Sequence, residues 1–525
     1  MANGGMPAAA RAPGSAAAGA AQGRWVLFGT ILASSMAYID GSALNVALPA
    51  VQAGLHATGP QLLWVVNSYL LMLAALILIG GSLGDKRGRK RVLMAGIALF
   101  LLASLVCGLA PTVEFLIAVR LVQGIGGALM IPGSLAIISA YFGEDRMGGA
   151  IGTWAAAGTI VTIGGPILGG VLANAGLWRG VFLINLPLGL VALLVLFYKV
   201  PESRDTTASR AIDYPGAVLV TLGLAGLTYG FIAAPDQGLT APATLIALLG
   251  GAVALALFVV VEARSPHPMV PLQLFRSHTF SGTNLLTLFL YGALSIGTFL
   301  LALNLVQVQG YSQTLAGFVF LPFSLLLAGL SRWTGRLVDR FGARPLLISG
   351  PALAGAGFLL LGLVGLSAGP PAYWTTFFPG IAVLGLGMAV TVAPLTTAVM
   401  DAVATHYAGT ASGINNAVSR TAGVLAIAIV GAVGLAVFGS VLETRTAALP
   451  LAPEIRAALQ AQTAQLGAAR VPPGVAPDQA AAVALAIKLA FVDAFRVVMF
   501  ICTGLAWLSG LMAALLVEAR SKPAA

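Results

Sequence analysis

Two charged residues, Asp40 and Arg120, lie deep inside long apolar runs of this chain. A charge in the middle of a membrane-spanning helix costs about 2.5–3.5 kcal/mol and usually has a function. Burial favours the neutral form of a carboxyl group and a nearby cation favours the charged form. We therefore expect Asp40 to load and release a proton or another cation. The alternative is structural, a hydrogen bond that holds a helix break near Pro49.

Arg120 cannot lose its proton under ordinary conditions, so it needs a carboxylate, carbonyl groups or water around it. Arg420 follows a polar strip that contains Asn415 and Asn416. We expect this strip either to line a substrate cavity or to anchor the helix bundle, and the sequence supports the two interpretations equally. The candidates for an aromatic wall of such a cavity are Tyr69, Trp154 and Tyr291.

A short loop motif occurs twice, 254 residues apart. The matching positions are Gly81, Leu83, Asp85 and Gly88 in the first copy, and Gly335, Leu337, Asp339 and Gly342 in the second. Arg89 follows the first copy, and Arg340 lies within the second. Asp85 can accept from helix N-terminal amides or from an arginine, which makes it a candidate charge latch between helices. A basic loop that merely fixes orientation is the alternative, but it does not explain the spaced glycines and aspartate.

A third pattern is Gly165-Pro166 followed by Gly169 and Gly170. Gly165 and Gly169 are four residues apart and share one helix face. Such a face allows close helix packing, and the proline can bend the helix. We expect this helix face to act as a hinge against the second half of the chain, as a packing face, or as both.

The composition restricts the classes of protein to which these residues can belong. The 525 residues are 58% hydrophobic and 8% charged, with a mean hydropathy of +0.96, whereas soluble domains are about 25% charged. A water-soluble enzyme is excluded, and a polytopic membrane protein is predicted. The four histidines are scattered, so no metal site, catalytic constellation or nucleotide loop can be built. We expect no enzyme activity, no cofactor and no nucleic-acid partner.

Fourteen apolar runs are long enough to cross a bilayer as helices of about 20 residues. They are 25–47, 61–83, 92–110, 115–137, 149–172, 180–199, 214–234, 242–261, 279–308, 315–332, 345–365, 376–399, 410–435 and 491–516. With the N-terminus inside, 19 of the 27 basic residues fall in inner segments and five in outer segments. This asymmetry predicts that both termini are cytoplasmic and explains the net charge of +10.

The repeat divides the chain into two six-helix halves with a pair of helices between them. We expect a disordered tail over 1–24, a first bundle over 25–199, a linker with two extra helices over 200–278, a second bundle over 279–516 and a tail over 517–525. The outer segment 436–490 is long, rich in Ala and Gln, and compatible with a short helical hairpin. Repeats of this kind are typical of transporters, with the substrate site between the halves.

The motifs resemble those of the major facilitator superfamily, in its fourteen-helix drug:proton antiporter branch. Residues 81–93 resemble the loop motif between helices 2 and 3, residues 116–128 the helix-4 motif, and residues 165–170 the helix-5 antiporter motif, although Val161 stands where a glycine is usual. Asp40 through Pro49 resembles the helix-1 motif of that branch. The resemblance implies an all-α fold of two six-helix bundles plus two central helices, and it implies that Arg120 takes part in coupling.

The function expected from this resemblance is proton-coupled export of lipophilic drugs or metabolites across the cytoplasmic membrane by a monomer. Self-resistance export of an antibiotic or lipid-like product is an alternative, and a membrane sensor without flux is a more distant one. Because Asp40 is the one deep carboxylate of the first half and spans 9–13 add none, we expect neutral or monocationic substrates.

Overall fold

The computed structural model describes residues 13–204, 213–404 and 407–518, and this part of the chain is helical without strands. The longer elements are α1 (Pro13–Leu55), α2 (Gly59–Arg87), α3 (Arg89–Gly108), α4 (Val113–Asn174), α5 (Gly180–Leu183), α6 (Asn185–Lys199), α7 (Tyr214–Gln237), α8 (Pro242–Arg264), α9 (His278–Leu303), α10 (Gln313–Val319), α11 (Leu321–Phe341), α12 (Ala343–Leu363), α13 (Phe377–Asp401), α14 (Ala408–Ala447), α15 (Pro453–Ala461) and α16 (Pro477–Leu516). Short helical turns are η1 (Leu272–Arg276), η2 (Asn304–Val308), η3 (Pro370–Ala372) and η5 (Thr463–Ala468). The predicted all-α fold is confirmed.

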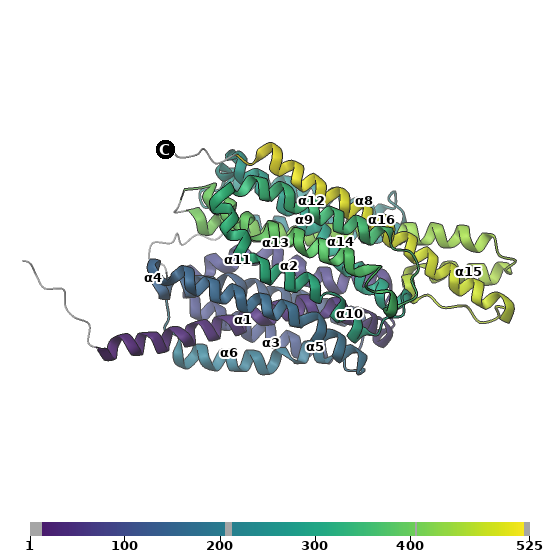
Figure 1. The fold of residues 1–525 in the computed structure, drawn as a ribbon, viewed down its shortest axis with the longest axis horizontal. Helices are drawn as coiled ribbons and strands as arrows, with labels where there is room; N and C mark the ends of the chain where they lie inside the picture. The colour runs from purple at the N-terminus through teal and green to yellow at the C-terminus, as the bar shows by residue number, and fades with distance from the viewer. Residues whose placement is uncertain (1–12, 205–212, 405–406, 519–525) are drawn as a thin grey trace, which may run out of the picture.

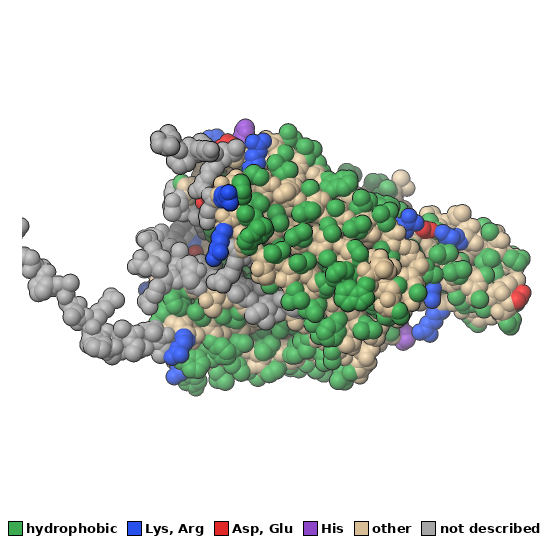
Figure 2. Space-filling model, viewed as in Figure 1, with side chains coloured by type: hydrophobic (Ala, Val, Ile, Leu, Met, Phe, Trp, Pro, Cys, Tyr) green, Lys and Arg blue, Asp and Glu red, His purple; other side chains and the backbone are tan. Residues whose placement is uncertain are grey.

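The helices form an elongated bundle with two distinct ends (Figure 1). At one end, which we call the terminal end, α1 begins and α16 finishes. At the other, the protruding end, α15 and the adjoining parts of α14 and α16 extend beyond the rest of the bundle. Figure 2 shows a wide apolar belt between these ends, with Lys and Arg gathered at the terminal end and where the protrusion joins the bundle. This distribution is that of a protein that spans a membrane.

Thirteen helical segments of the described chain are long and apolar enough to cross a membrane. The predicted span 149–172 belongs to α4, a helical stretch of 62 residues whose first arm is one of the thirteen. A straight helix of that length would measure about 93 Å, three times the thickness of a bilayer core. The two arms instead run in opposite directions.

Contacts with α1 establish the reversal. Phe142 lies beside Gly23 near the start of α1, Trp154 donates to Ser34 at 3.1 Å, and Gly169 packs on Ala43 further along. The second arm therefore runs parallel to α1, from the terminal end to the protruding end. The first arm starts at the protruding end, where Glu114 accepts from Gln61 at 2.6 Å. With this second arm, the described chain makes the fourteen crossings that the sequence predicts.

Two six-helix sets and an inserted pair make up the bundle. Helices α1 to α6 form one set. In the other, α9, α12 and α14 pack against α16, and α13 packs against α11 and α12. The inserted helices α7 and α8 pack together, and α7 contacts both α2 and α14, so the pair rests against a helix of each half. Most of α8 faces outward, with large apolar side chains such as Ile246 and Leu249 exposed for lipid.

Several elements are longer than the predicted spans. Helix α1 begins at Pro13, within the predicted tail 1–24, of which residues 1–12 lie outside the described part. Helices α14 and α16 have 40 residues each and extend well into the segment 436–490. A bilayer core needs about 20 residues, so roughly half of each helix is available for the protrusion. The segment is therefore built mainly as helix extensions, joined through α15 and η5, and less as a separate hairpin.

Candidate functional site

Asp40 and Arg120 form an ion pair in the middle of the first half. Asp40 on α1 is fully buried, and Arg120 on the first arm of α4 is 1% exposed. The guanidinium Nη1 donates to the Asp40 Oδ2 at 2.5 Å. A buried charge is tolerated when it is paired and hydrogen-bonded. The structure thus brings together two residues that are 80 positions apart and that the sequence identified separately.

Gln123 completes this pair. Its Nε2 donates to the Asp40 Oδ1 at 3.0 Å, and its Oε1 accepts from Arg120 Nη1 at 2.9 Å. Both carboxylate oxygens of Asp40 are therefore hydrogen-bonded. Ser104 connects the group to α3, since its hydroxyl accepts from Gln123 at 3.3 Å and from Asn185 at 3.0 Å.

Sequence reasoning did not identify Gln123, Ser104 or Asn185 as site residues. A signal existed for Gln123, because it follows Arg120 by three residues in the same motif, and such residues share a helix face. Ser104 and Asn185 gave no such signal, because their role depends on how α3 and α6 pack around α4.

Arg120 also contacts α2. Its Nε donates to the carbonyl oxygen of Val65 at 3.2 Å, and its guanidinium lies 4.4 Å from the ring centre of Tyr69. This is a cation–π distance, and such contacts gain strength when they are removed from water. The Tyr69 hydroxyl is buried and has no hydrogen-bond partner among the described residues. Helices α4 and α2 can approach closely here because Gly124 of α4 has no side chain. A Cβ on Gly124 would lie 2.5 Å from the carbonyl oxygen of Tyr69.

The polar strip of α14 lines a cavity of about 110 Å³ in the second half. Its lining residues are Tyr291 of α9, Leu395, Thr396 and Val399 of α13, and Ser412, Asn415, Asn416 and Ser419 of α14. The predicted residues Tyr291, Asn415 and Asn416 therefore share one cavity. Drug-sized pockets measure about 300–1,000 Å³, so this cavity accommodates part of such a ligand in the present conformation.

Three other predicted cavity residues lie elsewhere. Tyr69 lies against Arg120 in the first half. Trp154 is on the second arm of α4, where it donates to Ser34 and its ring centre lies 6.3 Å from that of Tyr38. Arg420 is half-buried on α14, next to the lining residue Ser419. The aromatic wall predicted from Tyr69, Trp154 and Tyr291 is therefore spread over both halves.

The first loop motif forms a compact turn at the terminal end. Asp85 near the end of α2 accepts from Arg89, the first residue of α3, at 2.8 Å. Gly88 between them has φ 109°, a conformation that favours glycine. The backbone amides of Lys90 and Arg91 donate to the carboxylate of Glu202, at 3.0 and 3.2 Å. Asp85 thus has the predicted arginine partner, whereas the helix N-terminus is bound by Glu202, which sequence reasoning missed.

The second copy shares the turn but not the surrounding contacts. Gly342 has φ 78°, and α12 starts after it without a side-chain cap. Arg340 lies 5.1 Å from the ring centre of Phe341. A Cβ on Gly335 would meet nothing within 4 Å. The side chain of Asp339 lies outside the described part of the structure.

The helix-5 glycines form contacts on two sides. A Cβ on Gly165 or Gly169 would collide with Ser42 or with the carbonyl oxygen of Ala43 on α1. A Cβ on Gly170 would collide with the carbonyl oxygen of Gln313 at the start of α10. This face is therefore a packing face toward α1, and it contacts the second half at one end. Pro166 belongs to that contact as well, because its carbonyl oxygen lies against Gly317 of α10.

At the protruding end, hydrogen bonds join the two halves. Gln307 donates to the Oε1 of Gln52 at 2.6 Å, and Gln52 donates to the carbonyl oxygen of Gln465 at 3.1 Å. Thr314 of α10 donates to the carbonyl oxygen of Gly170 at 3.3 Å. The two halves are thus in direct contact at this end.

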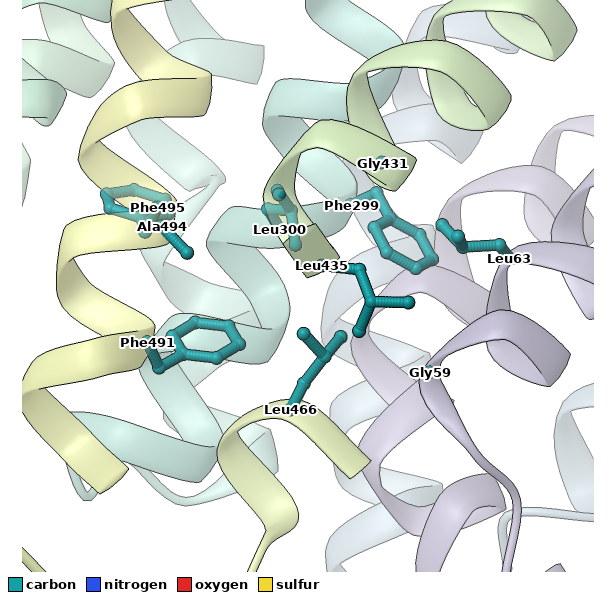
Figure 3. Close-up of a pocket in the computed structure, with 11 residues that line it drawn as sticks. Gly59, Leu63, Phe299, Leu300, Gly431, Leu435, Leu466, Phe491, Ala494 and Phe495 are labelled. Atoms are coloured by element: carbon teal, nitrogen blue, oxygen red, sulfur yellow. The ribbon is translucent and has the colours of Figure 1, made fainter. Parts of the chain in front are cut away.

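An apolar cluster lies beside these hydrogen bonds (Figure 3). Leu466 of η5 points toward Leu435 and Phe491 of the second half, and it also contacts Gly59 at the start of α2. Its φ of 54° is unusual for a residue with a side chain. The connection between α15 and α16 therefore packs against both halves.

Known proteins share this architecture and sequence pattern. The sequence profile of the Major Facilitator Superfamily matches residues 30–427. Multidrug resistance protein Stp of Mycobacterium tuberculosis is 37% identical over 422 residues, which cover 79% of this chain and 77% of that protein. Methylenomycin A resistance protein of Streptomyces coelicolor is 34% identical over 400 residues, covering 76% of this chain and 83% of that protein.

Among solved structures, a bacterial homologue of the human lysosomal transporter Spinster, crystallised in an inward-facing and unoccupied conformation, superposes with a TM-score of 0.64 at 17% identity. The match covers 95% of this chain and 99% of that one. At this identity the likeness shows the fold alone. Together with the profile match and the relatives, it establishes that the chain is a multi-pass membrane protein and belongs to the major facilitator superfamily.

Proposed function

We propose that this protein is a secondary active exporter that exchanges lipophilic drugs or antibiotics for protons. The observation that carries the proposal is the buried group of Asp40, Arg120 and Gln123, a titratable carboxyl held inside a membrane-spanning bundle. The relatives named for multidrug and methylenomycin A resistance support drugs or antibiotics as substrates. Self-resistance to an antibiotic is one form of the same activity.

The proton acts on the contact between α1 and α4. Uptake of a proton neutralises Asp40 and removes its attraction for Arg120, which retains Gln123, the Val65 carbonyl oxygen and the ring of Tyr69. Helix α1 also carries Gln52, which binds Gln307 of the second half at the protruding end. Protonation of Asp40 therefore loosens the middle of a helix whose end, at Gln52, holds the two halves together. Alternating access requires such a link between ion binding and the contact of the halves.

The terminal end is the cytoplasmic end in this proposal. Basic residues of the predicted inner segments gather there, as the positive-inside rule requires. The protein lies in the cytoplasmic membrane, with both termini inside and the α15 protrusion outside. Reporter fusions after Gly238, between α7 and α8, and after Gly474, before α16, should both read external. A cytoplasmic signal at either site contradicts this orientation.

The function is tested by efflux of a fluorescent lipophilic dye from vesicles that contain the purified protein. Export against a dye gradient should follow an imposed proton gradient and stop when an ionophore dissipates it. Vesicles without protein give the background. Binding without proton-driven flux would favour a membrane sensor, and chemical conversion of the dye would favour an enzyme.

A further inference from the structure

The charges near the centre of the molecule do not balance. Asp40 and Arg120 neutralise each other. Arg420 lies half-buried in the middle of α14, and it forms no ion pair or hydrogen bond in the described part of the chain. Its surroundings therefore carry one uncompensated positive charge, in a place where such a charge is expensive.

Other arginines of this protein show what a structural anchor looks like. Arg344 donates to the carbonyl oxygen of Ala514 at 2.6 Å. Arg496 donates to that of Gly362 at 3.1 Å, and Arg179 to that of Ala110 at 3.0 Å. Each ties two segments together through a backbone carbonyl. Among the residues that the structure describes, Arg420 has no such contact, although its five N–H donors could make several. Anchoring therefore does not account for Arg420.

The position of Arg420 is suited to a ligand. Helix α14 packs against α2 of the first half and α9 of the second. Three residues beyond Arg420, Gly423 lies against Ser295 of α9 and near Leu70 of α2, so this stretch of α14 borders both halves. Tyr38 of α1 and Tyr291 of α9, one from each half, are within electrostatic reach of Arg420. Arg420 is one turn beyond Asn416 and adjacent to Ser419, both of which line the cavity of the second half. A cation, aromatic rings and polar side chains thus converge on one region.

We propose that Arg420 binds the acidic group of the transported substrate, which is a lipophilic organic acid in its monoanionic form. The inference rests on the proposed export function and names its substrate class. The guanidinium fits a carboxylate through two parallel hydrogen bonds, while the partly exposed rings of Tyr38 and Tyr291 supply a surface for the apolar body. The expectation of neutral or monocationic substrates rested on Asp40 as the one deep carboxylate, whereas the structure pairs Asp40 with Arg120 and, among the described residues, leaves the cation Arg420 without a partner.

Binding to the purified wild-type protein gives the first test. Three probes share one body: a diethylaminocoumarin carboxylate, its neutral ethyl ester and its amide with a quaternary ammonium group. A charge-assisted hydrogen bond is worth about 1.5–3 kcal/mol, which corresponds to roughly 10- to 100-fold in affinity. We expect the carboxylate to bind about tenfold or more tightly than the ester, and the cation most weakly. Equal affinities, or a preference for the cation, would overturn the proposal.

Variants of Arg420 test whether this residue causes the preference for the carboxylate probe. Arg420→Gln should remove the preference for the carboxylate while ester affinity stays within about twofold, and Arg420→Lys should retain part of the preference. The matched control is Arg496→Gln, which removes an anchor and should leave the preference unchanged. If Arg420→Gln lowers carboxylate and ester binding in parallel, Arg420 is structural and the proposal is wrong. Should that variant fail to fold, the wild-type comparison and Arg420→Lys still decide.

Transport separates this proposal from the function on which it rests. If the carboxylate binds preferentially but no probe is exported, the exporter function fails and the anion site stands. If the ester is exported and the carboxylate is not preferred, the exporter stands and the anion site fails. Exchange of a monoanion for one proton moves two charges, against one for the neutral ester. A membrane potential should therefore accelerate export of the carboxylate more than export of the ester.

Discussion

The two six-helix halves share a plan and a repeated loop, yet they treat charge in opposite ways. In the first half, Asp40 and Arg120 are buried against each other and Gln123 satisfies both. In the second half, a cation on α14 has no partner among the described residues, and polar side chains beside it line a cavity. A closed charge pair can respond to a proton, whereas an open cation can bind a ligand. The difference suggests that coupling belongs to one half and recognition to the other.

The loops at the terminal end differ in the same manner. After Gly88, the first amides of α3 donate to Glu202, and Arg89 is paired with Asp85. After Gly342, α12 begins without a side-chain cap. The first loop is therefore tied to the chain that leaves α6, and the second lacks this tie.

The largest effect is expected from breaking the charge pair. Asp40→Asn should abolish proton-linked export, because the variant has no titratable carboxyl and leaves Arg120 uncompensated. Loss of one partner of a buried pair costs about 3–5 kcal/mol, so thermal stability should fall too. Dye efflux under a proton gradient measures the first effect, and thermal unfolding measures the second.

Asp493→Asn is the control for Asp40→Asn. The Asp493 carboxylate also pairs with an arginine, Arg445 at 2.6 Å, but it lies partly exposed. Normal export with unchanged pH dependence in Asp40→Asn would place coupling elsewhere.

The contact between the halves gives the second prediction. A Cβ at Gly170 would collide with the carbonyl oxygen of Gln313, so Gly170→Ala should obstruct closure of the protruding end. Overpacking costs about 1–3 kcal/mol, and we expect a loss of roughly tenfold in export rate. Gly164→Ala is the control, because a Cβ there meets nothing within 4 Å. Equal export rates in the two variants would show that this contact is not part of the cycle.

The third prediction concerns Asp85. Its side chain is 37% exposed, and exposed ion pairs contribute about 0–1 kcal/mol to stability. Asp85→Asn should therefore leave folding and substrate binding largely intact but slow transport several-fold, which initial rates and equilibrium binding can separate. A parallel fall in binding and flux would contradict a role in gating.

The smallest effect is expected at Glu202. Glu202→Gln keeps one of the two acceptor oxygens but removes the negative charge at the N-terminus of α3, where such a charge is worth about 0.3–1 kcal/mol. Thermal unfolding should show a small decrease, with Glu443→Gln as an exposed control. A larger loss of thermal stability in Glu202→Gln than in Asp40→Asn would contradict this order of effects.

The sequence determined the parts of the fold that depend on local composition. Apolar runs longer than a bilayer core predict crossings wherever the chain is placed, because the backbone must satisfy its hydrogen bonds internally within lipid. Basic residues between the runs predict orientation, and the repeated loop predicts two halves. Asp40, Arg120 and Arg420 could be singled out for the same reason, since a charge in an apolar run is conspicuous before any contact is known.

Tertiary structure decided which of these charges have partners. The sequence places Asp40 and Arg120 80 residues apart, and only the packing of α1 against α4 brings them to 2.5 Å. Asp493 has Arg496 three residues away on its own helix, at 3.9 Å, but Arg445, 48 positions earlier in the chain, lies closer, at 2.6 Å. Glu202 acts on α3 from a segment more than a hundred residues later in the chain. Spacing along a helix fixes which residues share its face, but the helix that this face meets depends on the packing of the whole bundle. The same packing leaves Arg420 without a partner among the described residues, on a stretch of α14 that borders both halves.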